Sequence, residues 1–150
     1  MFRHHRFPSK VLVLVAFGFV FAFTALVLSA LAQDMGRPTR KSVKWLTPQH
    51  TDQVNSPFTV KFEAIGMKTE PAGTEGSESG HHHIIIDGPA PDEGEVIPAD
   101  PKHLHYGKAQ TEAVIELPPG KHTLTLQFAD GLHRSYGASM RATIEIEVVK

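Results

Sequence analysis

The sequence predicts an all-β fold, an antiparallel immunoglobulin-like β-sandwich preceded by an N-terminal signal segment. Several segments alternate apolar and polar residues with the period of two that marks a half-buried strand. Turn signals rich in proline and glycine separate these segments, and no segment keeps a helical period over the length of a helix. Short strands with such turns are typical of a sandwich, and a closed barrel is the alternative architecture.

The first expected strand is SVKWL, residues 42–46, which places Val43 and Trp45 on one face. Each later strand also turns its apolar side chains to one face, which predicts a shared core. In chain order, these strands are expected at residues 58–65, 81–87, 103–106, 111–117, 122–128 and 143–148. The expected core comprises Trp45, Phe58, Val60, Phe62, Ile115, Leu124, Leu126, Phe128, Ile144 and Ile146.

The connections between these strands differ in length. The Pro-Pro-Gly sequence at residues 118–120 suits a type II turn, so residues 111–117 and 121–128 are expected to pair as a hairpin. By contrast, residues 66–80 and 88–101 are rich in glycine, proline and acids and are expected to be loops. Loops of this length are more often functional or mobile than mere connectors, and both flank a histidine-rich strand.

The N-terminus has the features of an export signal. Basic residues precede an uncharged apolar run over residues 11–28, and Ala30 and Ala32 provide the small-residue pattern of a signal peptidase site. We therefore expect residues 1–32 to be a signal peptide that is cleaved near Ala32, which makes the mature protein periplasmic or secreted. The alternative is a retained membrane anchor, because the apolar run reaches the lower length limit of a membrane span.

The chain after this segment is short and acidic. A linker is expected over residues 33–42, followed by a single domain over residues 43–150. This part has 12 basic against 16 acidic residues, a net charge of −4, which argues against a nucleic-acid partner. Because the sequence has no cysteine, nitrogen and oxygen atoms would be the main ligands of any metal.

GHHHIIIDG, residues 80–88, is the most unusual motif of the chain. Alternate residues of a strand point the same way, so His81 and His83 share one face while His82 shares the other with isoleucines. The isoleucine face resembles a core face. We therefore expect His82 to be structural and the other two histidines to be available for binding.

A second pair of histidines follows in HLHY, where His103 and His105 lie on one side of the expected strand. If the two strands are neighbours, both pairs can converge on one divalent ion, and copper and zinc both suit imidazole. The sequence therefore predicts a copper or zinc site with His81, His83, His103 and His105 as ligands. The alternative is that each histidine is a surface residue, or a buried residue bonded to the backbone.

Other residues could complete or support this site. His133, just past the end of a strand, is a fifth candidate ligand, although Asp130 beside it is also part of a turn signal. Asp87 could orient a ligating imidazole, or it could only turn the chain. If the metal kept an open position for water, Glu112 or Asp130 could act as a base.

GHHHIIID, PADPKHLHYGKAQTE, LPPGKHTLTLQFADGLH and IEIEV together resemble an uncharacterised family of exported bacterial proteins. The family is a domain of unknown function with a Gly-His-His-His-aliphatic-Asp motif, and the resemblance runs from about Val43 to Lys150. It implies the compartment and the extent of the domain, and it brings no established activity. The matching residues are His81, His82, His83, Asp87, His103, His105, Gln110, Thr111 and Glu112. Some relatives show HxPH where this chain has HRSYG, so a second histidine beyond His133 has no counterpart here.

Three functional interpretations are open on these observations. The leading one is an exported metal-binding module for copper or zinc. The second is a structural or interaction module, in which the histidines hydrogen-bond one another and the acidic loops contact an envelope protein. An enzyme is the least favoured, because neither a Ser/His/Asp order nor an HExxH motif is present. Membrane contact is expected only if residues 11–28 are retained.

Overall fold

The computed structural model describes residues 40–150, so the predicted signal peptide and residues 33–39 of the predicted linker lie outside the described residues. Strands dominate this part of the chain, and its only helix is a three-residue 3-10 turn. The elements are β1 (Ser42–Thr47), β2 (Gln53–Asn55), β3 (Phe58–Ile65), β4 (Lys68–Thr69), β5 (Ser79–Ile86), β6 (His103–Tyr106), β7 (Glu112–Ile115), β8 (Gly120–Ala129), η1 (Ala138–Met140) and β9 (Arg141–Val149). Within residues 40–150, no helix is long and apolar enough to cross a membrane.

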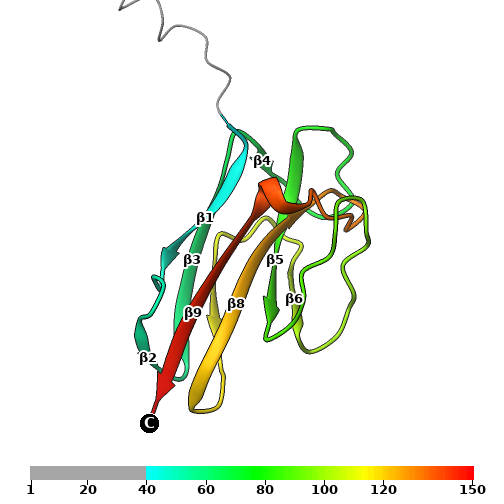
Figure 1. Ribbon diagram of the computed structural model, residues 1–150. Helices are drawn as coiled ribbons and strands as arrows, with labels where there is room; N and C mark the ends of the chain where they lie inside the picture. The colour runs from blue at the N-terminus through cyan, green and yellow to red at the C-terminus, as the bar shows by residue number, and fades with distance from the viewer. Residues whose placement is uncertain (1–39) are drawn as a thin grey trace, which may run out of the picture. The chain divides into compact units, whose positions relative to one another are not determined.

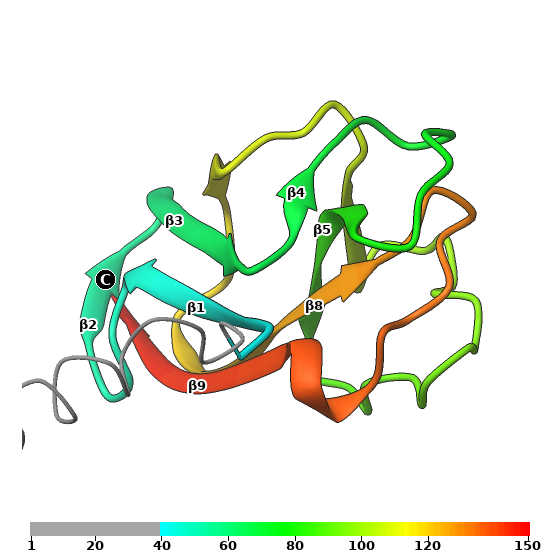
Figure 2. The same cartoon turned by 90° about the horizontal axis from the view of Figure 1, so that it is seen from above.

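The strands form two sheets that pack against each other (Figures 1 and 2). One sheet has the order β1-β3-β7, and the other has the order β2-β9-β8-β5-β4, with β6 also paired to β5. Most pairings are antiparallel, whereas β2 with β9 and β4 with β5 are short parallel pairings. The predicted all-β sandwich is therefore confirmed, with two parallel pairings that the sequence did not indicate.

The hydrophobic core lies between the two sheets. All ten residues predicted for the core are buried in one cluster. Trp45 of β1 packs edge-on against Phe62 of β3 with ring centroids 6.1 Å apart. Its indole nitrogen donates a hydrogen bond of 3.0 Å to the carbonyl of Ala142 in β9, which joins the two sheets. The alternation of apolar residues thus predicts the buried faces correctly.

The predicted hairpin between residues 111–117 and 121–128 is wrong. β7 pairs with β3 in the first sheet, whereas β8 pairs with β5 and β9 in the second. The chain crosses from one sheet to the other at the two prolines, and the Leu117 amide donates to Ser56 Oγ at 3.0 Å near the start of β3. Alternation could not distinguish the two cases, because a strand in either sheet turns the same residues to the shared core.

β5 is buried on both faces along its whole length. Its inner face, with Ile84 and Ile86, belongs to the core between the sheets. Its outer face carries His81, His83 and Ile85, and Ile85 is fully buried although it lies outside that core. β5 therefore has a second covered surface, whereas the outer face of an antiparallel sheet is commonly open to solvent.

Two segments, residues 88–101 and 130–137, cover this outer face, and we call them the outer-face loops. They pair with each other: the Ile97 amide donates to the His133 carbonyl at 2.9 Å, and the Ser135 amide donates to the Glu95 carbonyl at 2.8 Å. The Pro91 carbonyl accepts a bond from Arg141 of β9, which fastens the first loop to the sheet. The long predicted loop 88–101 is thus ordered by packing.

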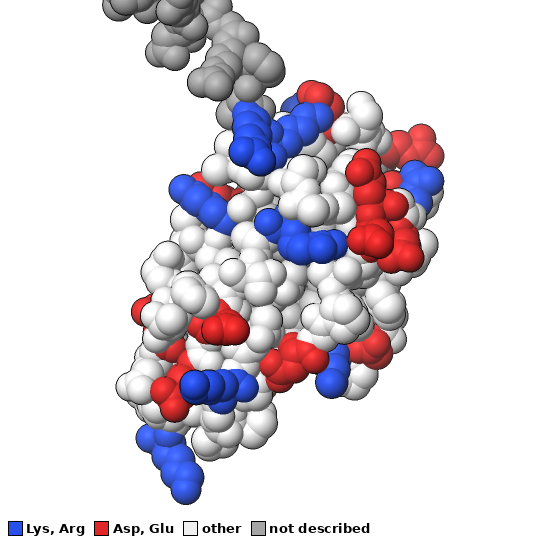
Figure 3. Space-filling model, in the orientation of Figure 1, with Lys and Arg blue, Asp and Glu red and all other residues white. Residues whose placement is uncertain are grey.

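Charged side chains of both signs are interspersed on the face of residues 40–150 that Figure 3 shows. Several of them form exposed ion pairs, such as Lys41 with Glu78 at 2.9 Å and Lys44 with Glu63 at 2.7 Å. Exposed pairs of this kind contribute little to stability, because water screens them. The histidines that could form a functional site lie instead under the outer-face loops.

Candidate metal centre

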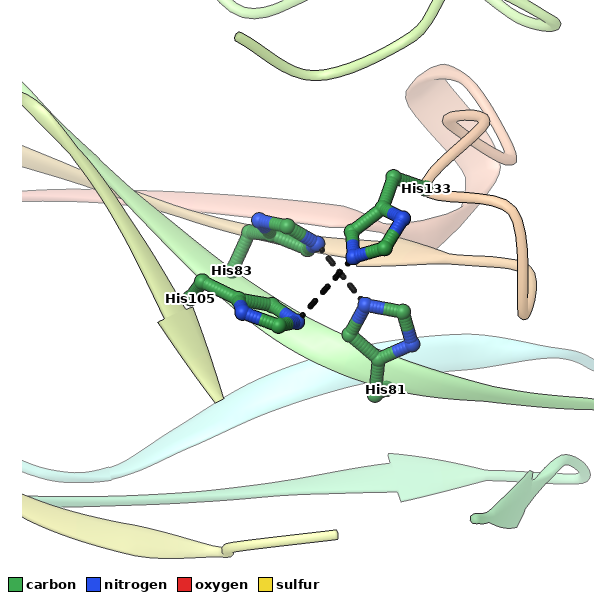
Figure 4. Close-up of side chains that lie close together, drawn as sticks. All are labelled: His81, His83, His105 and His133. Carbon is green, nitrogen blue, oxygen red and sulfur yellow. Dashed lines mark hydrogen bonds between the residues drawn. The ribbon is translucent and has the colours of Figure 1, made fainter. Parts of the chain in front are cut away.

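Four histidines bring their ring nitrogens together on the outer face of β5 (Figure 4). His81 and His83 come from β5, His105 from β6, and His133 from the second outer-face loop. One nitrogen from each ring belongs to a set whose members all lie within 4.8 Å of one another. Nε2 of His81 is 3.0 Å from Nε2 of His83, and Nε2 of His105 is 3.2 Å from Nε2 of His133. We call this group the four-histidine cluster.

Strand register decides which histidine of HLHY joins the cluster. In the antiparallel β5–β6 pair, His105 lies opposite His83 and His103 lies opposite Ile85. His103 is therefore displaced along the sheet, and its Nδ1 pairs with Asp100 Oδ1 at 2.9 Å. The expected convergence of His103 with the other ligands is thus corrected: His133, the fifth candidate from the sequence, takes its place.

The loop that carries His133 is built around Asp130. The Asp130 carboxylate accepts bonds from the amides of Leu132 and Arg134, both at 2.9 Å, and from Arg134 Nε at 2.8 Å. The His133 amide donates to the Asp130 carbonyl at 2.9 Å, and the His133 backbone is left-handed with a φ of 66°. Asp130 is therefore a positioning residue for His133, and its carboxylate is occupied by loop contacts.

Burial keeps the β5 histidines uncharged. His81 is 0% and His83 is 2% exposed, whereas His105 is exposed and His133 is partly buried. Burial, followed by repulsion from neighbouring imidazoles, lowers the pKa of His81 to about 4 and the pKa of His83 to about 2. The same causes lower the pKa of His105. Neutral imidazole has a free lone pair, and this is the form that binds metal.

The buried rings of the cluster have nitrogens without partners. Within the described residues, Nδ1 of His81 and Nδ1 of His83 make no hydrogen bond. A buried polar group left in this way costs about 1–3 kcal/mol. Such groups are few in native proteins and commonly indicate a functional site, or a water or ion at the site.

His82 lies on the opposite face of β5, inside the core. Its ring packs between Phe62 and Phe128, with both centroid distances at 4.8 Å. Neither ring nitrogen makes a hydrogen bond of good geometry within the described part of the chain, and the nearby Gln110 backbone only partly offsets the effect of burial on the pKa. Burial is the main cause that lowers its pKa to about 4, so the ring is neutral near pH 7. The structure thus places His82 with the isoleucines, as the alternation predicts.

Two glycines let backbone segments close around the cluster. A methyl group on Gly107, directly after β6, would lie 2.3 Å from the His105 ring. A methyl group on Gly80, directly before His81, would lie 2.1 Å from the Ala129 carbonyl oxygen of β8. The glycines of GHHH and HLHYG are therefore part of the site. Gly107 is not among the residues predicted for the site, and its position immediately after the HLHY strand is the signal that could have revealed it.

Asp87 and Glu112 do not contact the four-histidine cluster. Asp87 binds His122, with 2.8 Å between Oδ2 and Nδ1, and it accepts a second bond of 2.8 Å from the Thr123 amide. It therefore orients a histidine, although not one of the cluster. Glu112 lies on β7 in the other sheet and pairs with Lys61 at 3.3 Å. The expectation that either residue supports the metal site is corrected by these positions.

The fold and the cluster together define a class of protein, an all-β sandwich domain with four histidines gathered under loops on the outer face of one sheet. A family model described as Domain of unknown function (DUF4399) matches residues 60–149, and the chain belongs to this family. The match confirms the resemblance to an uncharacterised family, and it includes all four histidines of the cluster. No curated protein and no solved structure matches the chain.

Proposed function

We propose that the protein is an exported binding protein for one divalent transition metal ion, copper or zinc. The ligands are the four-histidine cluster, His81, His83, His105 and His133. The observation that carries the proposal is their convergence, since four rings from three separate elements bring nitrogens within 4.8 Å of one another. Imidazole is a suitable ligand for both metals, and one ion can reach all four nitrogens after a small contraction.

Protonation and packing support the same function. Burial keeps His81 and His83 neutral, so little proton competition opposes metal binding near pH 7. Asp130 holds the loop of His133, and Gly107 makes room for the ring of His105. Rings that are fixed before binding lose less conformational entropy when an ion arrives.

The competing function is a structural or protein-interaction module of the cell envelope, in which the histidines only bind one another. A shared proton within each close pair would satisfy two nitrogens. Such protons would join the rings only two at a time, His81 with His83 and His105 with His133. A metal ion makes use of all four rings at once, so the geometry favours metal binding.

Calorimetric titration with Cu(II) and Zn(II) tests the proposal on tag-free protein recovered from the cell envelope. We expect one ion per chain, and we expect a His81→Ala/His83→Ala double variant to lose binding. His103→Ala is the matched control, because His103 lies on the same face of β6 but outside the cluster. Binding that survives removal of both β5 histidines in a folded protein would refute the shared site.

Export is part of the same proposal, and it rests on the charged N-terminus, the apolar run and the A-x-A pattern before residue 33. Intact mass of the protein from an exporting cell measures it directly. We expect a chain that begins at Gln33. A full-length species that stays in the membrane would show that residues 11–28 act as an anchor.

A further inference from the structure

The rings of the four-histidine cluster are arranged almost symmetrically. Four rings define six centroid-to-centroid distances, and these are 4.8, 4.9, 4.9, 5.0, 5.1 and 5.7 Å. The His83–His133 distance of 5.7 Å is the longest, but the complementary pair, His81 and His105, is only 5.0 Å apart, so the rings do not form two opposite pairs. Six nearly equal distances between four points describe a tetrahedron (Figure 4).

The distances can be compared with the two geometries that four imidazoles adopt around an ion. With zinc–nitrogen distances of about 2.0–2.1 Å, ring centroids in a tetrahedral site lie about 5.2 Å apart for every pair. In a square-planar site, the usual arrangement for Cu(II) or Ni(II), four pairs lie about 4.5 Å apart and two opposite pairs about 6.4 Å. The observed range of 4.8–5.7 Å fits the tetrahedron and lacks the long pairs of the square plane.

The nitrogen positions agree with the ring positions. A tetrahedral zinc site places its nitrogens about 3.3 Å from one another. The two closest Nε2 pairs are 3.0 and 3.2 Å apart, so they are near this spacing already. The set as a whole lies within 4.8 Å, so a modest shift of the His105 and His133 rings is enough to close the remaining pairs.

The donor atoms restrict which tetrahedral ion fits. Cu(I) also accepts four-coordinate geometry, but it is selected by thiolate and thioether sulfur. The sequence has no cysteine, and the two methionines of the described domain, Met67 and Met140, pack with the hydrophobic core. Four imidazoles without sulfur suit Zn(II), which has no geometric preference of its own and accepts the tetrahedron that the protein offers.

Resting on the proposed metal-binding function, we propose that the four-histidine cluster is a closed, tetrahedral zinc(II) site of the structural type. Structural zinc sites have four protein ligands, whereas catalytic sites have three and keep one position for water. Here His81 and His83 belong to the sheet, His105 to an edge strand and His133 to an outer-face loop. The ion therefore fastens the loop to the sheet and does not activate water.

Cobalt(II) substitution tests the geometry separately from binding. We expect the tag-free protein to bind one Co(II) with the intense visible absorption of a tetrahedral complex, and one equivalent of Zn(II) to displace it. His103→Ala should keep this spectrum, whereas His133→Ala should shift its bands and weaken Co(II) binding, because a water oxygen replaces an imidazole nitrogen. A weak absorption of the kind given by six-coordinate Co(II), in a protein that still needs His81 and His83 for binding, would overturn the tetrahedral assignment alone.

A second measurement uses Cu(II) electron paramagnetic resonance. A square-planar Cu(II) site gives a large hyperfine splitting along the unique axis, and we expect the cluster to give a clearly reduced one because the protein imposes a tetrahedral distortion. A normal square-planar spectrum would overturn the inference. Absence of binding by Zn(II), Co(II) and Cu(II) alike would instead refute the proposed function, so the two failures are distinguishable.

Discussion

His105 lies directly opposite His83 in the β5–β6 pair, whereas His103 lies opposite Ile85. This register places one histidine of HLHY in the four-histidine cluster and leaves the other beside Asp100. We predict that His105→Ala lowers zinc affinity at least about tenfold, since even supporting residues of metal sites change affinity by about 10–100-fold. His103→Ala should leave affinity unchanged. Competition with a chromogenic chelator measures both variants, and equal losses would contradict the register.

Asp130 acts through the loop that carries His133. We expect Asp130→Ala to lower zinc affinity about tenfold or more, because three bonds to its carboxylate fix the backbone around His133. Asp100→Ala is the matched control, since Asp100 binds His103 outside the cluster. Calorimetry of both variants makes the comparison. Unchanged affinity in Asp130→Ala would show that the outer-face pairing with Ile97 holds His133 by itself.

Gly107 limits the position of the His105 ring. A methyl group there would lie 2.3 Å from the ring, so Gly107→Ala should displace His105 and weaken zinc binding. In a His105→Ala background, the same substitution should have no further effect on affinity, because the ring that it displaces is gone. A double-mutant cycle measured by chelator competition tests this. Additive losses would mean that Gly107 acts through some other part of the fold.

His82 is a neutral, unpartnered ring between Phe62 and Phe128. Replacing a buried unpartnered polar group with an apolar one of similar size is about neutral or stabilising. We predict that His82→Leu keeps or raises the free energy of unfolding, by about 0–2 kcal/mol in urea titrations. Zinc affinity should not change, since the ring faces away from the cluster. A large loss of stability would reveal a hydrogen bond that His82 needs.

The pair of His122 and Asp87 should make stability depend on pH. Burial alone would lower the pKa of His122, but its bonds to Asp87 and to the Pro118 carbonyl raise it. Burial would raise the pKa of Asp87, but its bonds to the Thr123 amide and His122 lower it. The histidine stabilises the fold below its ordinary pKa of about 6.5, and this contribution is lost as pH rises through the raised value. The aspartate stabilises above about 3.9, and this contribution is lost as pH falls through the lowered value.

The pair is therefore strongest between about pH 4 and pH 6.5. We predict that His122→Ala lowers the free energy of unfolding more at about pH 5.5 than at about pH 8.5, by a difference on the order of 1 kcal/mol. Urea unfolding at the two pH values measures this difference. An equal loss at both values would mean that the ring contributes only packing.

Alternation in the sequence predicts strands and buried faces because the period of two is a local property. It places Trp45, Phe62 and Leu126 in the core and separates His82 from the two histidines beside it. Alternation cannot assign a strand to a sheet. For that reason it could not reveal that the chain crosses from one sheet to the other at residues 118–120, where a hairpin was expected.

Register and loop structure are the parts of the site that sequence could not supply. His103 and His105 are equivalent in the pattern HLHY, and only the pairing of β6 with β5 distinguishes them. His133 has no strand pattern at all, and it reaches the cluster through contacts of Asp130 and Ile97 with its loop. Such contacts depend on segments that are distant in the chain, so no local signal encodes them.

The four ligands of the cluster are spread along the chain, and the last of them, His133, follows β8. β8 pairs with β5 along residues 81–86, and this pairing brings the loop that carries His133 beside the β5 histidines. During synthesis, until His133 has been added, the chain offers at most three of the four imidazoles. At the proposed site, zinc therefore binds late, after the domain has folded. It stabilises the folded domain and does not direct its folding.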